Sequence, residues 1–119
     1  MSELMTVKLV LTPLILATGG LIIWLARAAA KGRLGRNPFA GIRTPTTMAS
    51  DEAWRTAHVA ARVPTEIGGW CAIGATVVMI LAPWIWLVFA ATIIAATLLT
   101  ACVAYGAVRG GRAARSLED

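Results

Sequence analysis

Two long apolar stretches dominate the sequence and leave few folds open to it. The first runs from Leu9 to Ala26 without a charged residue, and the second covers about 42 residues from Ile67 to Val108. A helix needs about 20 residues to cross a bilayer, so these stretches provide one crossing and two crossings. Hydrophobic residues make up 58% of the chain and charged residues 14%, which is too apolar for a soluble domain of 119 residues. We therefore predict an all-α integral membrane protein.

The three crossings are predicted at about residues 5–30, 65–82 and 84–108, within one membrane domain that comprises residues 1–119. Pro83 separates the second crossing from the third, because a proline can end one helix and stand at the start of the next. A secretory signal peptide is the alternative for the first crossing. Its apolar run is long for a signal peptide and its basic residues follow the run, so we favour a retained helix.

The basic residues predict how the chain is oriented. Residues 31–66, between the first and second crossings, contain six of them, and the tail 109–119 contains three more, whereas only Lys8 lies toward the other side. The positive-inside rule then places this loop and the C-terminus in the cytoplasm and the N-terminus outside the plasma membrane. Anionic lipid headgroups and topology account for the net charge of +5, so we expect the bilayer as a partner and no nucleic acid.

The cytoplasmic loop contains the most specific sequence. Residues 37–47 carry two prolines and three threonines, which favour turns and extended backbone. Ser50 then provides an N-cap, and an amphipathic helix is predicted at about 51–62, ending before Pro64. This helix either lies on the lipid headgroups with Trp54 dipped inward, or packs Trp54 onto the three-helix bundle. Both alternatives stay open.

Reactive groups are scarce. Cys71 and Cys102 both lie in apolar segments, where a cysteine behaves as a small hydrophobic residue. The sole histidine, His58, has no second ligand at metal spacing, so we expect it to pack or to form hydrogen bonds. We predict no catalytic residue, no metal site and no cofactor, and therefore no enzyme.

Arg43 is the basic residue most suited to recognition. Its guanidinium stays charged and offers five donors, and prolines and threonines on both sides suggest a shaped loop. It can pair with Glu66, the acid at the start of the second crossing, or bind a lipid phosphate or a partner's carboxylate. Glu66 can instead complement the dipole of a helix N-terminus.

Residues 37–60 resemble the signature of the SdpI family of bacterial membrane proteins. That family has a Gly-x-Arg-Thr-Pro segment, then a threonine, and a short helix later a tryptophan followed by a small residue and a histidine. The matching residues here are Gly41, Arg43, Thr44, Pro45, Thr47, Trp54, Ala57 and His58. Together with their neighbours they define the predicted binding loop, which consists of Asn37, Gly41, Arg43, Thr44, Pro45, Thr47, Trp54, His58 and Glu66.

The resemblance implies an immunity protein, which protects its producer from a secreted, membrane-active peptide toxin. The family is also implicated in holding a transcriptional repressor at the membrane, so a tether for a cytoplasmic regulator is a second hypothesis. The residues themselves favour a third, a small accessory subunit of a larger membrane enzyme or transporter. Glycine and alanine recur along the crossings and permit close helix approach, which is also compatible with an oligomer.

Overall fold

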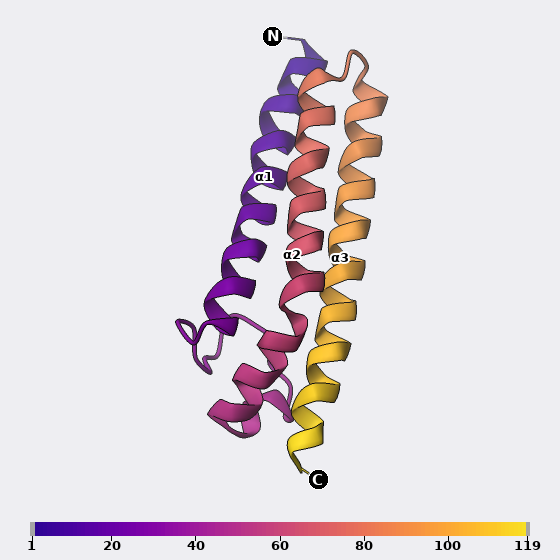
Figure 1. Ribbon diagram of the computed structural model, residues 1–119. Coiled ribbons are helices and arrows are strands. Elements are labelled where there is room, and N and C mark those ends of the chain that lie inside the picture. Colours follow the sequence, from indigo (N-terminus) through magenta and orange to yellow (C-terminus); the bar gives the residue numbers. More distant parts are fainter. Residues whose placement is uncertain (1, 119) are drawn as a thin grey trace.

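The computed structural model describes residues 2–118 and is helical almost throughout (Figure 1). Three long helices and two short 3-10 turns follow one another in the order α1 (Glu3–Ala30), η1 (Thr47–Ala49), α2 (Asp51–Leu81), α3 (Ile85–Arg115) and η2 (Ser116–Glu118). Residues 2–118 contain no strand. Each long helix is long and apolar enough to cross a membrane, so the predicted all-α class with three membrane-spanning helices is confirmed.

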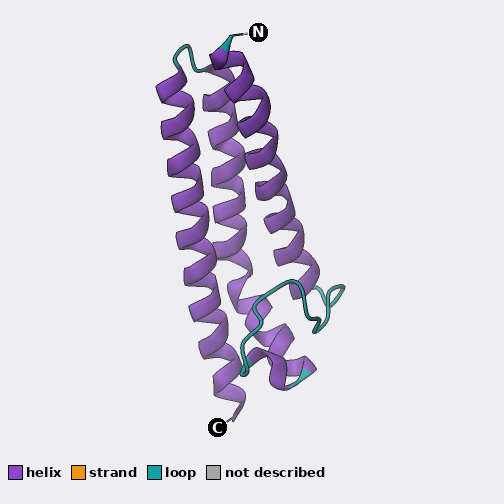
Figure 2. Ribbon diagram, turned by 180° about the vertical axis from the view of Figure 1, so that it is seen from behind, coloured by secondary structure: helices purple, strands orange, loops and turns teal. Residues whose placement is uncertain are grey.

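The helices form one elongated, up-and-down bundle with α2 in the middle (Figure 1). The N-terminus lies beside the α2–α3 turn, and the loop between α1 and α2 lies with the C-terminus at the opposite end (Figures 1 and 2). The molecule is 57 Å long and about 20 Å across. Since a hydrocarbon core is about 30 Å thick, the bundle extends beyond the membrane. We call the end of the bundle that carries the α1–α2 loop the loop end.

The predicted division between an amphipathic helix at 51–62 and a crossing at 65–82 is wrong. Helix α2 continues through Pro64, which is buried inside it, and the helix changes direction within its first turns (Figure 1). Proline removes one backbone hydrogen bond and bends a helix without necessarily ending it. Contacts with α3 hold both sides of this bend, because Ala61 lies against Gly106 before Pro64, and Gly68 lies against Cys102 after it.

Helix length and charge place the membrane boundary on α2 near Arg62. About 20 residues suffice to span the hydrocarbon core, and the segment from Arg62 to Leu81 provides them. The first turns of α2 therefore project beyond the membrane together with the α1–α2 loop. At this level α1 carries Arg27, whose guanidinium pairs with Glu66 of α2, so charged groups of both helices mark the same boundary.

The end of α1 directs the chain toward α2. Gly32 adopts a positive φ of 81°, a conformation that costs glycine little and other residues more. The backbone N–H of Arg33 donates to the Ala28 carbonyl at 2.8 Å, and that of Gly32 to the Ala29 carbonyl at 3.3 Å. These two bonds form a Schellman motif, which satisfies carbonyls that the helix end leaves free.

The opposite end of the bundle is closed by a short turn and a small apolar core. Met79, Ala82, Val88 and Ala91 form that core, and Lys8 of α1 donates from Nζ to the Ile80 carbonyl at 2.8 Å. A cation at a helix C-terminus satisfies a free carbonyl and complements the helix dipole. The turn itself follows the prediction, although Pro83 precedes the cap residue Trp84 and α3 begins only at Ile85.

Close contact between α2 and α3 depends on glycine, and one adjacent pair of glycines tests this. A Cβ added at Gly110 would stand 2.5 Å from the Ala57 carbonyl oxygen, whereas at Gly111 it would meet nothing within 4 Å. We expect Gly110→Ala to lower the free energy of unfolding by about 1–3 kcal/mol, because the helices must separate. Gly111→Ala should be neutral or slightly stabilising. Thermal unfolding in detergent compares them, and equal behaviour would contradict the close contact.

Candidate binding site in the signature loop

The site occupies the loop end and is organised around Trp54 in the first turn of α2. Only 2% of this side chain is exposed. Its indole Nε1 donates to the Leu34 carbonyl in the loop at 2.8 Å, and its ring lies 4.2 Å from the ring of His58 between centroids. Of the two alternatives for this residue, the structure supports packing on the protein, because a tryptophan dipped into headgroups would remain exposed.

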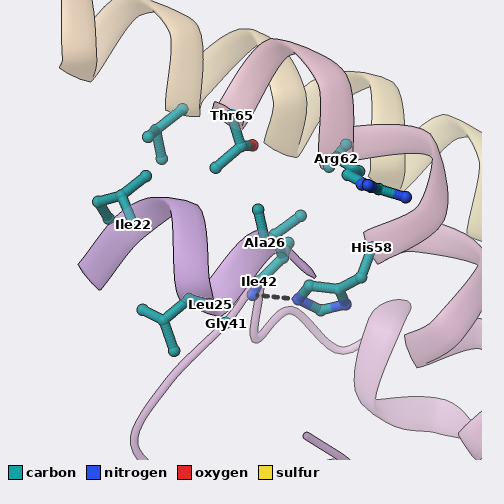
Figure 3. A pocket seen from close by; sticks show the side chains of 10 residues that line it. Ile22, Leu25, Ala26, Gly41, Ile42, His58, Arg62 and Thr65 are labelled. Carbon is teal, nitrogen blue, oxygen red and sulfur yellow. Dashed lines mark hydrogen bonds between the residues drawn. The ribbon is translucent and has the colours of Figure 1, made fainter. Parts of the chain in front are cut away.

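His58 connects α2 to the loop in one defined protonation state. Its Nε2 accepts the backbone N–H of Ile42 at 2.9 Å, and its Nδ1 lies 2.7 Å from the Trp54 carbonyl. An acceptor nitrogen must be unprotonated, so the proton resides on Nδ1, which donates to that carbonyl. Figure 3 shows the ring turned toward the loop, with its bond to Ile42 dashed. The imidazole is therefore neutral and structural in this arrangement.

The neutral state of His58 predicts a pH dependence. Burial lowers the pKa of His58 from its ordinary 6.5, and the hydrogen bond to the Trp54 carbonyl opposes this shift only in part. As pH falls below about 6.5, the unfolded chain binds a proton that the folded chain does not, so stability is full above that pH and decreases below it. Protonation also removes the acceptor of the Ile42 bond, worth about 1–2 kcal/mol.

Thermal unfolding in detergent between pH 7.5 and 5 measures this loss. His58 is the only histidine in the chain, so His58→Gln should abolish the pH dependence in that range. A stability that stays constant down to pH 5 in the wild type would contradict the neutral, loop-bonded histidine.

Gly41 allows the loop to approach these two rings. Its φ of 102° lies in a region that residues with a side chain rarely adopt. A Cβ at this position would stand 2.6 Å from Cη2 of Trp54 and 2.9 Å from Nε2 of His58. Two independent constraints, backbone conformation and space, therefore require glycine here.

The threonines of the signature hold the next turn. The Thr47 hydroxyl is fully buried; it donates to the Ile42 carbonyl at 2.6 Å and accepts the Thr44 backbone N–H at 3.0 Å. The Thr44 hydroxyl in turn accepts the Thr47 backbone N–H at 3.2 Å. Pro45 stands between them, where its missing N–H leaves no unsatisfied donor. Hydroxyls that cap a turn in this way fix a loop without regular structure.

Asn37 shapes the first part of the loop. Its side-chain oxygen accepts the backbone N–H groups of Phe39 and Ala40 at 2.9 and 2.8 Å. Its amide nitrogen donates to the carbonyls of Gly35 and Ala40 at 2.9 and 3.1 Å. All four bonds lie within the loop, so this asparagine closes a turn by itself. The turn leaves the Phe39 side chain 89% exposed.

Arg43 and Glu66 do not pair with one another. Arg43 donates from Nη1 to the Pro38 carbonyl within the loop. Glu66 instead accepts from Arg27 of α1 at 2.8 Å and from Arg62 of α2 at 2.7 Å. Arg62 and Glu66 are four residues apart in one helix, a spacing that brings side chains together. The predicted helix end before Pro64 concealed this pairing.

Removal of the Glu66 carboxylate should loosen α1 from α2 at the membrane boundary. Only 14% of its side chain is exposed, and it bonds one guanidinium from each helix. We expect Glu66→Ala to lower the free energy of unfolding by about 2 kcal/mol, since two charge-assisted hydrogen bonds are lost. Glu52→Ala is the control, because that exposed carboxylate has no ion pair within residues 2–118. Equal melting temperatures for both variants would contradict a structural role of Glu66.

A partly open pocket lies between α1, the loop and α2, directly above His58 and Ile42. Its volume is about 140 Å³, and most of its lining is apolar (Figure 3). The pocket is lined by Ile22, Leu25, Ala26, Gly41, Ile42, His58, Ala61, Arg62, Thr65 and Val103. Such a space can accept an apolar side chain or part of an acyl chain, with the polar groups of Arg62 and Thr65 at its edge.

The structure thus brings together most of the predicted site residues, although they bond one another rather than point into open space. Gly41 and His58 line the pocket, the Trp54 ring packs against both of them, and the threonines fix the turn. Glu66 belongs to a separate ion-pair cluster. The sequence alone did not reveal Arg27 and Arg62 as partners of Glu66, nor the backbone groups to which Trp54 and His58 form hydrogen bonds.

The arrangement offers shape and hydrogen bonds rather than reactive groups. Within residues 2–118, no three side chains of His, Cys, Asp or Glu cluster as metal ligands would. The comparison with curated proteins finds no match, and neither does the comparison with solved structures. A family model, that of the SdpI/YfhL protein family, matches residues 33–103, which is more than half of the chain and includes the whole signature. The chain belongs to the SdpI/YfhL protein family.

Proposed function

We propose that this protein is a non-enzymatic membrane protein that protects its cell from a membrane-active peptide. The observation that carries the proposal is the apolar pocket between α1, the loop and α2, at the level where the bundle leaves the membrane. Membership of a family of membrane proteins that is in general non-catalytic supports it. A membrane-active peptide inserts apolar side chains at that same depth.

The signature residues would make this pocket rigid. His58 and Gly41 form part of its wall, and their positions depend on bonds to Trp54 and Ile42. A preformed pocket binds more tightly than one that must be ordered first. In this mechanism the peptide places one apolar side chain in the pocket, while the lipid-facing helices contact the rest of its apolar face.

A deletion strain tests the proposal. Cells that lack the gene should be sensitive to the culture supernatant of the wild-type strain, and expression of the wild-type chain should restore growth. Val103→Phe narrows the pocket from α3 and should fail to protect. Val108→Phe makes the same change at an exposed position of that helix outside the pocket and should protect fully.

Equal protection by both phenylalanine variants would eliminate the pocket as the binding site. If deletion caused no sensitivity, the immunity function itself would be wrong. Arg43→Ala serves as a further probe. The guanidinium of Arg43 donates from Nη1 to the Pro38 carbonyl and keeps its other N–H groups free to bind a partner. We expect this variant to insert normally and to protect poorly.

The charge distribution supports a plasma-membrane location with the loop end in the cytoplasm. The loop and the tail lie at one end of the bundle (Figure 1), and most basic residues belong to them. Reporter fusions to each terminus test the orientation, which requires a cytoplasmic C-terminus and an external N-terminus.

Phe39 favours a second candidate function, a tether for a soluble regulator. Its side chain is 89% exposed in the loop between α1 and α2, between the basic residues Arg36 and Arg43 of the sequence. Exposed aromatic and arginine side chains dominate the binding energy of many protein interfaces. A soluble protein that co-purifies with the wild type and not with Phe39→Ala would support the tether. A large membrane protein at equal stoichiometry would instead indicate an accessory subunit.

A further inference from the structure

A second cavity lies along α1, on the approach to the end of that helix. It measures about 300 Å³, and its lining includes Gly20, Trp24, Arg27, Lys31 and Arg33. Three of these residues are cationic, and the lining contains no acidic residue of the described chain. The signature-loop pocket uses other residues of α1, so the two cavities are separate.

Positive charge at this cavity is only partly neutralised. Arg27 uses its Nε on the Glu66 carboxylate, and that carboxylate is shared with Arg62. One negative charge therefore faces two guanidiniums. The side chains of Lys31 and Arg33 form no ion pair within residues 2–118. Arg27 retains its two terminal nitrogens as donors, in the planar arrangement that suits a phosphate.

The cavity changes from apolar to cationic along the helix. Gly20 and Lys31 are separated by about 16 Å of helix. At the apolar end, Gly20 and the half-exposed Trp24 both line the cavity. A Cβ added to Gly20 would meet nothing within 4 Å, so this part of the cavity is open, and we call it the notch. Indoles are enriched at the membrane interface. The cationic end coincides with the charged boundary at which α1 leaves the membrane.

We infer that this cavity binds one anionic phospholipid. Arg27, Lys31 and Arg33 hold its phosphate, and an acyl chain lies in the notch at Gly20 beside Trp24. A free phosphate would use the cationic end alone and leave the apolar half empty. Basic pockets at this depth of membrane proteins are suited to anionic headgroups. The inference concerns a lipid site and is independent of the proposed immunity function.

Native mass spectrometry of the purified full chain in mild detergent tests the site, with phosphatidylglycerol and phosphatidylcholine as probes. The wild type should bind phosphatidylglycerol more tightly. Replacement of Lys31 and Arg33 by glutamine should weaken that binding by about 25-fold, because each cation near the headgroup contributes a factor of about five to the affinity. The matched control replaces Arg112 and Arg115 of α3 by glutamine, which removes the same charge from the same end. This control should bind as the wild type does.

A second pair of variants tests the acyl-chain notch without any change of charge. Gly20→Leu fills the notch and should weaken phosphatidylglycerol binding, whereas Gly74→Leu makes the same change on α2. Both glycines have open space around them, so neither variant should disturb the bundle. Equal weakening by the two glutamine pairs, equal affinity for both lipids, or binding unaffected by Gly20→Leu would overturn the inference. Displacement of the lipid by inorganic phosphate would assign the site to a free anion instead.

Discussion

Replacement of Trp54 by alanine should release the signature loop while the three helices remain inserted. The side chain is almost fully buried, stacks on His58 and donates to the Leu34 carbonyl. Loss of a buried tryptophan typically lowers the free energy of unfolding by about 3–5 kcal/mol. Here the loss should fall on the loop end, because the apolar crossings do not depend on this residue. Trypsin should then cleave the loop after Arg36 and Arg43 much faster than in the wild type.

Two further variants separate the contributions of this tryptophan. Trp54→Phe keeps an aromatic ring but removes the Nε1 donor, so it should cost about 1–2 kcal/mol and increase cleavage moderately. Trp70→Ala is the matched control, because Trp70 lies on the same helix with 53% of its side chain exposed. It should leave the loop protected. If Trp54→Ala and Trp70→Ala were cleaved at the same rate, the loop would not depend on the buried indole.

Gly41→Ala should disrupt the same region from the loop side. The new methyl group would require an unfavourable positive φ and would stand 2.6 Å from the Trp54 ring. Strain of this kind costs about 1–3 kcal/mol and overpacking a similar amount, so we expect the free energy of unfolding to fall by about 2–6 kcal/mol. Hydrogen exchange should show a faster Ile42 amide, since that amide loses its bond to His58.

Gly35→Ala provides the control for this variant. Gly35 lies in the same loop, and a Cβ there would meet nothing within 4 Å. The substitution should leave both the Ile42 amide and the melting temperature unchanged. A normal Ile42 amide in Gly41→Ala would mean that the loop can reach His58 with a different backbone conformation.

The sequence predicted the crossings well because their signal is local. Each needs only a run of about 20 apolar residues, and the structure places helices over all three runs. It failed at Pro64, where we expected a helix to end. Proline lowers the local preference for helix, but the contacts of Ala57 and Ala61 with glycines of α3 maintain it. Those contacts join residues about 45–53 positions apart, which no local pattern reveals.

The site was predictable in its residues but not in its bonds. The signature identified Gly41, Trp54 and His58 as special, and the structure explains this by their mutual contact. The choice between lipid and protein as the surroundings of Trp54 stayed open, because an amphipathic pattern fits both. Likewise, Arg43 and Glu66 had suitable charges for a pair, yet Arg27 and Arg62 lie closer to that carboxylate.

The sequence by itself determined that this chain crosses a membrane three times, with its basic loop and tail at one end. Hydrophobic length and charge decide these features, and both can be read one segment at a time. The tertiary structure decided how the loop end is built: the continuous α2, the neutral His58, the buried Trp54 and the carboxylate shared between two helices. Each of these depends on backbone groups and side chains that are distant in the chain and become neighbours only when the helices pack.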